Sequence, residues 1–328
     1  MSNQDLMDQV RQVGRQAALA AGALLKLNYE KPHDITLKSA IDPVTESDFA
    51  AQKTIISLIR QTFQDHGILA EERMDDEMKD NVGEGAKVQS PLPPPPHPPQ
   101  SLENEKGPEK SGLPAQTSQE PLSGLGGGSG GRAGTSGPWP SPQETASEAY
   151  RWIIDPLDGT VNFAHGFPMF CVSIAFEAAG VVEYGVVYEP LRDELFEAVR
   201  GGGAWLNRRS LQVSGVDRMD AALLATGFPY DIRERLPETL ARMGRVLAVS
   251  QGLRRAGSAA LDLAYVAAGR MDGFFEENLK PWDTAAGMLL VIEAGGAVST
   301  FAGKPYTIFS DNIMASNGLL HEALLKVL

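Results

Sequence analysis

Apolar residues recur at helical spacing in two segments near the beginning of the chain. In residues 4–28 they return every three or four positions among polar residues, which predicts an amphipathic helix. A second segment with the same spacing runs to about residue 64, and Thr45 or Ser47 can cap its first turn. The intervening Asp42-Pro-Val-Thr45 is predicted to be extended or turning, because its proline disfavours helix at the preceding residue.

Short apolar runs bounded by glycine or acidic residues predict strands. Gly67-Ile-Leu-Ala70 is followed by two glutamates, and Arg151-Trp-Ile-Ile154 runs into Asp155, where Pro156 is expected to force a turn. Two further pairs of strands are predicted at residues 171–176 and 181–188, and at 194–199 and 204–206. Helical spacing returns at residues 259–268 and 284–294.

Residues 74–149 differ in composition from the rest of the chain. They hold the proline run 91–99, Ser-, Gln- and Glu-rich segments and the glycine run 124–131, with few apolar residues. Such a segment buries too little apolar surface to offset its ordering entropy, so we predict that it is disordered. We therefore divide the chain into 1–73 and 150–328, which form one mixed α and β domain, and the insert 74–149. The proline run is interpreted as a spacer, with a ligand for an aromatic-lined groove as the alternative.

Charge and cysteine content narrow the functional classes. The net charge of −13 argues against broad nucleic-acid binding, which requires a basic face. Clustered carboxylates instead suit Mg²⁺ or Ca²⁺, although most of the acidic residues are expected on the solvated surface. Cys171 is the single cysteine, so it can form no intrachain disulfide and no cysteine zinc cluster. Without a signal sequence or an apolar run of membrane-spanning length, the expected location is the cytoplasm.

The segment Trp152-Ile-Ile-Asp155-Pro-Leu-Asp158-Gly-Thr160-Val-Asn162-Phe163 combines several features of a metal and phosphate site. A strand delivers Asp155 to its end, and Gly159 lets the backbone approach a ligand beside Asp158. Thr160 and Asn162 then open a helix or turn whose free N–H groups can face an anion. The simpler interpretation is an Asx turn that caps a helix. Glu71-Glu72, Asp283 and Asp48 are each ambiguous alone, as surface acids or helix caps.

Taken in order, five segments of the chain resemble the motifs of the inositol monophosphatase family. They are Asp42-Pro-Val-Thr-Glu-Ser-Asp48, Ala70-Glu-Glu72, Trp152 to Phe163, Gly257-Ser-Ala-Ala260 and Trp282-Asp-Thr-Ala-Ala-Gly287. The resemblance covers about residues 1–72 and 150–328. It implies the layered α-β-α-β-α sandwich of the inositol monophosphatase and fructose-1,6-bisphosphatase type, in the α/β class.

The resemblance also implies a Mg²⁺ site with two or three ions. Glu71, Asp155 and the Leu157 carbonyl are the expected ligands of the first ion. Asp155, Asp158 and Asp283 are expected to hold a second, and Glu71 a third through water. Carboxylate and carbonyl oxygens are the donors that this hard cation prefers.

Catalytic and substrate-binding roles follow from the same resemblance. Thr160, hydrogen-bonded to Asp48, is expected to help Glu71 orient and activate the attacking water. Backbone groups of Gly159 and Thr160 would hold the phosphate. The expected contacts with the alcohol part of the substrate are Gly257, Ser258, Ala259 and Glu276, with Glu277 as the competitor of Glu276. Lys38 matches a basic residue near the site.

The implied function is Mg²⁺-dependent hydrolysis of inositol monophosphate or a similar small polyol or sugar monophosphate. Fructose-1,6-bisphosphatase, nucleotide 3′-phosphatase and a partner-binding role in transcription are the alternatives, and a homodimer without membrane association is expected. Two features depart from the family pattern: Ala70 replaces a usual glycine, and the insert separates Glu71 from Asp155. Because loop closure becomes costlier only slowly with length, we expect the site to survive the insert.

Overall fold

The computed structural model describes residues 3–31, 33–39, 42–72, 88–89, 149–229 and 231–328. We predicted that residues 74–149 are disordered. Apart from Val88–Gln89 and Ala149, this segment lies outside the described residues. Val88–Gln89 forms the two-residue strand β4, which pairs with β1 (Asp34–Ser39). On its other side β1 pairs with β2 (Asp42–Thr45) in an antiparallel ribbon. The extended conformation predicted for 42–45 is therefore confirmed.

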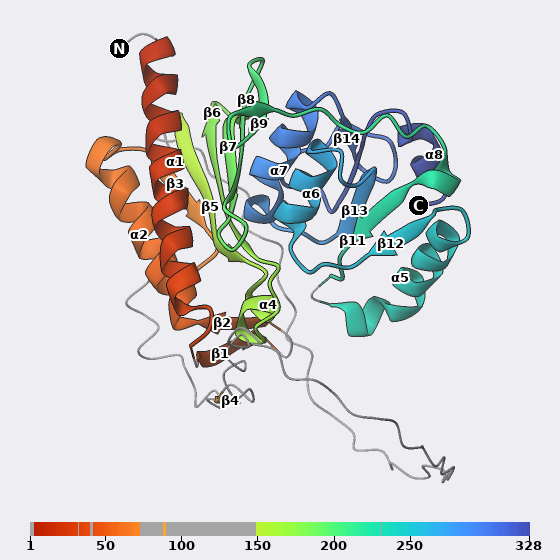
Figure 1. Cartoon of the computed structure of the whole chain (residues 1–328), viewed down its shortest axis with the longest axis horizontal. Coiled ribbons are helices and arrows are strands. Elements are labelled where there is room, and N and C mark those ends of the chain that lie inside the picture. The colour runs from red at the N-terminus through yellow and green to blue at the C-terminus, as the bar shows by residue number, and fades with distance from the viewer. Residues whose placement is uncertain (1–2, 32, 40–41, 73–87, 90–148, 230) are drawn as a thin grey trace, which may run out of the picture. The chain divides into compact units, whose positions relative to one another are not determined.

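Two long helices cover one face of the main sheet. α1 (Asn3–Asn28) and α2 (Glu46–Thr62) lie where the apolar spacing predicts them. Thr45 caps α2: its hydroxyl accepts a hydrogen bond from Ser47 N at 3.2 Å. Both helices pack together and against the sheet through a cluster that includes Ile55 and Trp152 (Figure 1). This burial of apolar side chains is the main force that holds the N-terminal layer in place.

The main sheet has seven strands in the order β10-β9-β8-β7-β6-β5-β3. Its strands are β3 (Gly67–Ala70), β5 (Tyr150–Asp158), β6 (Cys171–Ala178), β7 (Val181–Glu189), β8 (Glu194–Val199), β9 (Gly203–Leu206) and β10 (Arg209–Ser210). All neighbours are antiparallel except β3 and β5, which are parallel. The insert thus lies in the connection between two parallel strands that adjoin each other in the sheet.

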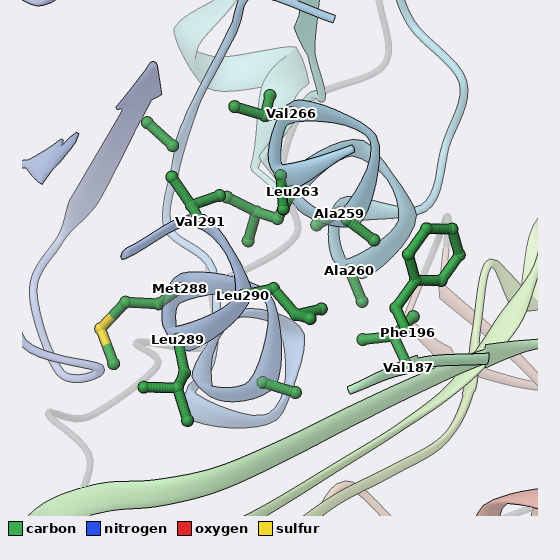
Figure 2. Packing of buried hydrophobic residues seen from close by; sticks show 14 of the residues in the cluster. Val187, Phe196, Ala259, Ala260, Leu263, Val266, Met288, Leu289, Leu290 and Val291 are labelled. Atoms are coloured by element: carbon green, nitrogen blue, oxygen red, sulfur yellow. The ribbon is translucent and has the colours of Figure 1, made fainter. Parts of the chain in front are cut away.

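Two buried helices form the central layer behind this sheet. They are α6 (Ala259–Ala267) and α7 (Pro281–Glu293). Their close approach depends on glycine: a Cβ at Gly287 would lie 2.6 Å from Cβ of Leu263, and one at Gly185 of β7 would lie 2.9 Å from Cα of Ala286. Figure 2 shows the apolar side chains of both helices meeting there, with Val187 and Phe196 of the sheet beside α6. The small residues after Asp283 therefore allow α7 to pack closely against α6 and β7.

A second sheet and two outer helices complete the fold. The sheet has the order β12-β11-β13-β15-β14, and a short 3-10 helix, Met219–Ala221, precedes it. Its strands are β11 (Leu223–Thr226), β12 (Gly252–Arg254), β13 (Gly273–Glu277), β14 (Ala297–Ser299) and β15 (Asn312–Ser316). The outer helices are α5 (Ile232–Leu247) and α8 (His321–Leu325). In Figure 1 the layers follow one another as α1 and α2, the main sheet, α6 and α7, the second sheet, then α5 and α8. The predicted five-layer sandwich is confirmed.

Candidate active site

The parallel pairing of β3 and β5 brings the first two predicted ligands together. Ala70 lies opposite Ile154 in this register, and Glu71 N donates a hydrogen bond to the Ile154 carbonyl at 3.1 Å. Glu71 and Asp155 each follow directly after one of these residues. Parallel strands end at the same edge of a sheet, so both carboxylates reach one cavity although the insert separates them along the chain.

The course of the chain after Asp155 differs from the prediction. Pro156 does not end the strand, because β5 continues to Asp158. Its pairing with β6 is instead irregular between Asp155 and Asp158, where a proline that lacks an N–H donor is tolerated. Within this irregular segment Leu157 N donates to Asp155 Oδ1 at 3.0 Å. Asp155 thus forms an Asx-type turn within the strand, but the alternative of an Asx turn that caps a helix is wrong, because the N-cap of the next helix is Gly159 and it makes no side-chain cap hydrogen bond.

Gly159 changes the direction of the chain and starts the short helix α4 (Thr160–Ala164). Its φ of 98° is in the left-handed region, and a Cβ there would lie 2.8 Å from the Met169 carbonyl. The Thr160 hydroxyl lies 3.1 Å from Asp48 Oδ1 and 3.0 Å from the Leu157 carbonyl. Asp48 is fully buried, and its other oxygen accepts hydrogen bonds from Thr45 N and Oγ1. The predicted contact between Thr160 and Asp48 is present.

Asp158 is held by the first turn of α6. Its Oδ2 accepts hydrogen bonds from Ser258 Oγ and from Ala260 N, both at 2.7 Å. Ser258 also caps α6, and Gly257 precedes it with a φ of 87°. Gly257, Ser258 and Ala259, which were predicted to contact the substrate, line the cavity. In this structure, however, the Ser258 hydroxyl donates a hydrogen bond to Asp158.

Asp283 and Glu276 line the same cavity. α7 begins at Pro281, three residues before the predicted start, and Asp283 accepts a hydrogen bond from Lys280 N at 2.7 Å. Glu276 lies on β13, and its carboxylate packs against Gly227. A Cβ added to Gly227 would lie 2.0 Å from Glu276 Oε2, so only glycine leaves space for this carboxylate. Its competitor Glu277 is bound instead by Arg242, at 2.6 and 3.1 Å.

All the predicted site residues except Asp48 line one cavity of about 130 Å³. Its electrostatics are those of crowded, buried carboxylates. Burial, followed by repulsion from Glu71, raises the pKa of Asp155 well above its ordinary value. Burial and repulsion from Asp158 do the same for Asp283. Burial raises the pKa of Asp158 to about 6, against the opposing effect of the hydrogen bonds from Ser258 and Ala260.

Comparison with known proteins identifies this arrangement. The family model described as "Inositol monophosphatase family" matches residues 6–88 and 110–328. The chain belongs to the inositol monophosphatase family. It is 35% identical over 318 residues to an inositol-1-monophosphatase of Synechocystis sp., covering 97% of this chain and 88% of that protein. It is also 37% identical over 311 residues to the Nus factor SuhB of Escherichia coli K12, covering 94% and 91%.

A solved structure shows the same architecture. The extragenic suppressor protein SuhB from Bartonella henselae matches with a TM-score of 0.73 and 33% identity, covering 97% of this chain and 98% of that one. The protein is accordingly a phosphatase of the inositol monophosphatase superfamily. Of the helices in the described residues, none combines the length and hydrophobicity needed to cross a bilayer.

The donor set of this inositol monophosphatase-family cavity fits a hard divalent cation. Glu71, Asp155, Asp158 and Asp283 supply only oxygen. Burial and mutual repulsion raise the pKa values of Asp155 and Asp283, and a bound cation would offset this repulsion. Among the described residues, no group of three or more His, Cys, Asp or Glu side chains is arranged so that it could hold a metal ion. Mg²⁺ coordination by these carboxylates therefore remains a prediction.

Several residues that position the site were not found from the sequence. The Gln52 side chain binds both backbone groups of Glu72, with Nε2 donating to the carbonyl at 2.6 Å and Glu72 N donating to Oε1 at 3.0 Å. Asn162 Nδ2 donates to the Met169 and Ala256 carbonyls, at 2.7 and 2.9 Å. A polar residue on a helix gives no local signal of such long-range contacts.

Lys38, which was matched to a basic residue near the site, has a side chain that lies outside the described residues.

Two further cavity residues were also missed. Arg255 lies with its guanidinium carbon 4.9 Å from the centre of the Phe228 ring, in cation–π geometry. Asp262 is buried within α6, and both Asp262 and Arg255 line the cavity near Glu276. Asp262 falls within the apolar pattern of α6, so the sequence favoured a core helix and did not single it out.

Proposed function

We propose that this protein is a Mg²⁺-dependent phosphomonoesterase that hydrolyses inositol monophosphate or a similar small polyol or sugar monophosphate. The observation that carries the proposal is that one cavity is lined both by the acidic residues Glu71, Asp155, Asp158 and Asp283 and by the buried carboxyl of Glu276. The four acidic residues suit metal ions that bind a phosphate, and Glu276 offers an acceptor to hydroxyl groups of the alcohol.

The metal ligands we propose are those implied by the family pattern. Glu71, Asp155 and the Leu157 carbonyl would hold one Mg²⁺, and Asp158 and Asp283 would share a second with Asp155. When bound, Mg²⁺ supplies neutralisation of phosphate charge and a lower pKa of coordinated water. Backbone N–H groups of Gly159 and Thr160 would then hold the phosphate oxygens, since both residues line the cavity.

Thr160, Asp48 and Glu71 would prepare the attacking water. The buried Asp48 carboxylate fixes the Thr160 hydroxyl by accepting its hydrogen bond, and the carboxylate of Glu71 can accept a proton from a water between them. Attack of the water oxygen on phosphorus breaks the bond to the alcohol oxygen. One proton of the attacking water, accepted first by Glu71, ends on the leaving alcohol, and the other stays with the phosphate. The products are the free alcohol and inorganic phosphate, without a covalent enzyme intermediate.

A substrate panel tests this function. Rates of phosphate release would be compared for inositol 1-phosphate, fructose 1,6-bisphosphate and adenosine 3′,5′-bisphosphate, each with Mg²⁺ and with EDTA. We expect the highest kcat/KM for inositol 1-phosphate and no release in EDTA. A preference for either bisphosphate would replace the proposal with the corresponding activity of the same superfamily, and release in EDTA would remove the metal from it.

The Nus factor SuhB relatives favour a second candidate, a partner-binding role in transcription alongside catalysis. The E. coli protein of that name is similar over almost the whole length of this chain. Affinity capture from cell extract with the full chain, and with a variant that lacks residues 74–149, would test it. Enrichment of transcription proteins with the full chain would support the role, and loss of that enrichment in the variant would assign it to the insert. The same preparation would test the predicted homodimer by light scattering and the predicted cytoplasmic location by fractionation.

A further inference from the structure

Asp262 is a buried residue whose carboxyl oxygen Oδ1 has no hydrogen-bond partner in the described part of the chain. Its relative exposure is 1%, yet its Oδ1 contacts no donor among the described residues. Its backbone N–H is accounted for, because it donates to the Ser258 carbonyl within α6. Buried polar atoms are almost always paired in folded proteins, and an unpaired one often marks a position that binds a ligand.

The location of Asp262 indicates what that ligand could be. Asp262 lines the cavity together with Glu276 and Arg255, one helical turn beyond Ser258. The charged groups around it are Glu276 and Asp158, which repel its negative charge, and Arg255, which attracts it. Burial, followed by repulsion from Asp158, raises the pKa of Asp262 well above its ordinary value. A second anion is therefore unfavourable here, whereas a hydroxyl can donate to either protonation state.

Asp262 is separate from the groups that position the phosphate. The Ser258 hydroxyl and Ala260 N both donate hydrogen bonds to Asp158, so the donors of the first turn of α6 bind a member of the acidic cluster. Asp262 has no such bond among the described residues, and together with Glu276 it gives the cavity two buried carboxyl groups that interact electrostatically. Two such acceptors suit a molecule with more than one hydroxyl group.

We propose that Asp262 is a specificity-determining residue that accepts a hydrogen bond from a hydroxyl of the substrate alcohol. The assignment rests on the proposed phosphomonoesterase function and deepens it. The preferred substrates are monophosphates of polyhydroxylated alcohols, which can satisfy Asp262 and Glu276 together. Phosphates of simple aryl alcohols leave the buried carboxyl unpaired and are discriminated against.

The experiment compares Asp262→Leu and Asp262→Asn with the wild-type protein on two substrates. Inositol 1-phosphate carries hydroxyl groups, whereas the leaving group of p-nitrophenyl phosphate carries none. We expect Asp262→Leu to lower the ratio of the two kcat/KM values by about tenfold or more. Asp262→Asn keeps an acceptor oxygen and should restore part of that ratio. Ratios equal to the wild-type value in both variants would overturn the assignment.

Asp272→Asn is the matched control for burial of an aspartate. Asp272 is 5% exposed, and its carboxylate accepts hydrogen bonds from Leu223 N at 2.7 Å and from Ser214. Its replacement should lower the thermal midpoint and leave the substrate ratio unchanged. Asp262→Leu should not lower the midpoint, because no hydrogen bond of Oδ1 is lost; a fall as large as that of the control, with an unchanged ratio, would mean a structural role.

Binding of free inositol separates this inference from the proposed function. We expect inositol to raise the thermal midpoint of the wild-type protein and the shift to disappear in Asp262→Leu. If the wild-type protein binds inositol in this way but releases no phosphate from inositol 1-phosphate, the proposed function fails and the assignment of Asp262 stands. If wild-type and variant respond equally to inositol, the assignment fails whatever the phosphatase assay shows.

Discussion

Gln52 binds the backbone of Glu72 through two reciprocal hydrogen bonds, which join the middle of α2 to the segment after β3. Gln52 is fully buried and Glu72 is 5% exposed, so water cannot replace either bond when the side chain is removed. The position of Glu71, one residue earlier, depends on this anchor and on its own backbone bond to Ile154.

Gln52→Ala should therefore destabilise the protein and impair the site together. Two buried backbone groups would lose their partners, at a cost of about 1–3 kcal/mol each. Urea denaturation would measure the free energy of unfolding, and phosphate release would report on Glu71. Gln61→Ala is the control, since Gln61 is an exposed residue of the same helix. Equal stability of the two variants would contradict the proposed anchoring.

Asp155→Asn should abolish Mg²⁺-dependent phosphate release, because Asp155 is the proposed ligand shared by two ions. Repulsion from Glu71, Asp158 and Asp283 contributes to the raised pKa of Asp155. Its neutralisation should therefore leave the thermal midpoint in EDTA unchanged or higher. Retained activity would reject the metal assignment, and a large fall of the midpoint in EDTA would show that the carboxylate is needed for folding.

Thr160→Ala should lower kcat by about 10²-fold or more, the range typical of lost proton-transfer catalysis, with a small change in KM. Thr160→Ser keeps the hydroxyl that contacts Asp48 and should recover most of the rate. Steady-state kinetics on inositol 1-phosphate would measure both. A serine variant as slow as the alanine variant would indicate that the methyl group, and not the hydroxyl, matters at this position.

Gly227→Ala should raise KM for inositol 1-phosphate, because the added methyl would collide with the Glu276 carboxylate, 2.0 Å away, and displace it. Gly244→Ala in α5 is the control, since a Cβ there meets nothing within 4 Å. The control should keep its KM and gain about 0.5–1 kcal/mol in helix stability. An unchanged KM in Gly227→Ala would remove Glu276 from substrate binding.

His66 should make stability fall in mild acid. Trp152 Nε1, which can only donate, lies 3.2 Å from His66 Nδ1, so this nitrogen is an acceptor and the ring is neutral. Burial lowers the pKa of His66 below its ordinary 6.5. The unfolded chain therefore binds the proton more tightly, and the stability contributed by the neutral ring is lost as pH falls from above 6.5 through the lower pKa of the folded state.

His66→Asn keeps an acceptor for Trp152 but does not titrate. Its free energy of unfolding should decline less steeply than that of the wild-type protein between pH 7 and the lowest pH at which the protein stays folded. His165→Asn, a change of an exposed histidine, should keep the wild-type slope. If both variants followed the wild-type curve, the contact with Trp152 would have no influence on acid stability.

The amino-acid sequence alone determined the elements whose patterns are local. The apolar spacing of residues 4–28 and 45–64 located α1 and α2, and the short apolar runs located the central strands of the main sheet. The Asp-Pro-Leu-Asp-Gly-Thr string and its companion motifs identified the family, because each is a short run of residues that can be recognised without knowing the fold. By contrast, the continuation of β5 through Pro156 was missed, since a bulge depends on the pairing with β6.

Only the tertiary structure decided which side chains meet. The order of the second sheet, with β11 between β12 and β13, arises from pairing between distant segments that no local pattern specifies. The same applies to Glu276 and Glu277, which both line the cavity: Gly227 leaves space for the Glu276 carboxylate, whereas Arg242 binds that of Glu277. A side chain's partners depend on the packing of all the layers together. For that reason the buried, unpaired oxygen of Asp262 became visible only once the fold had placed it.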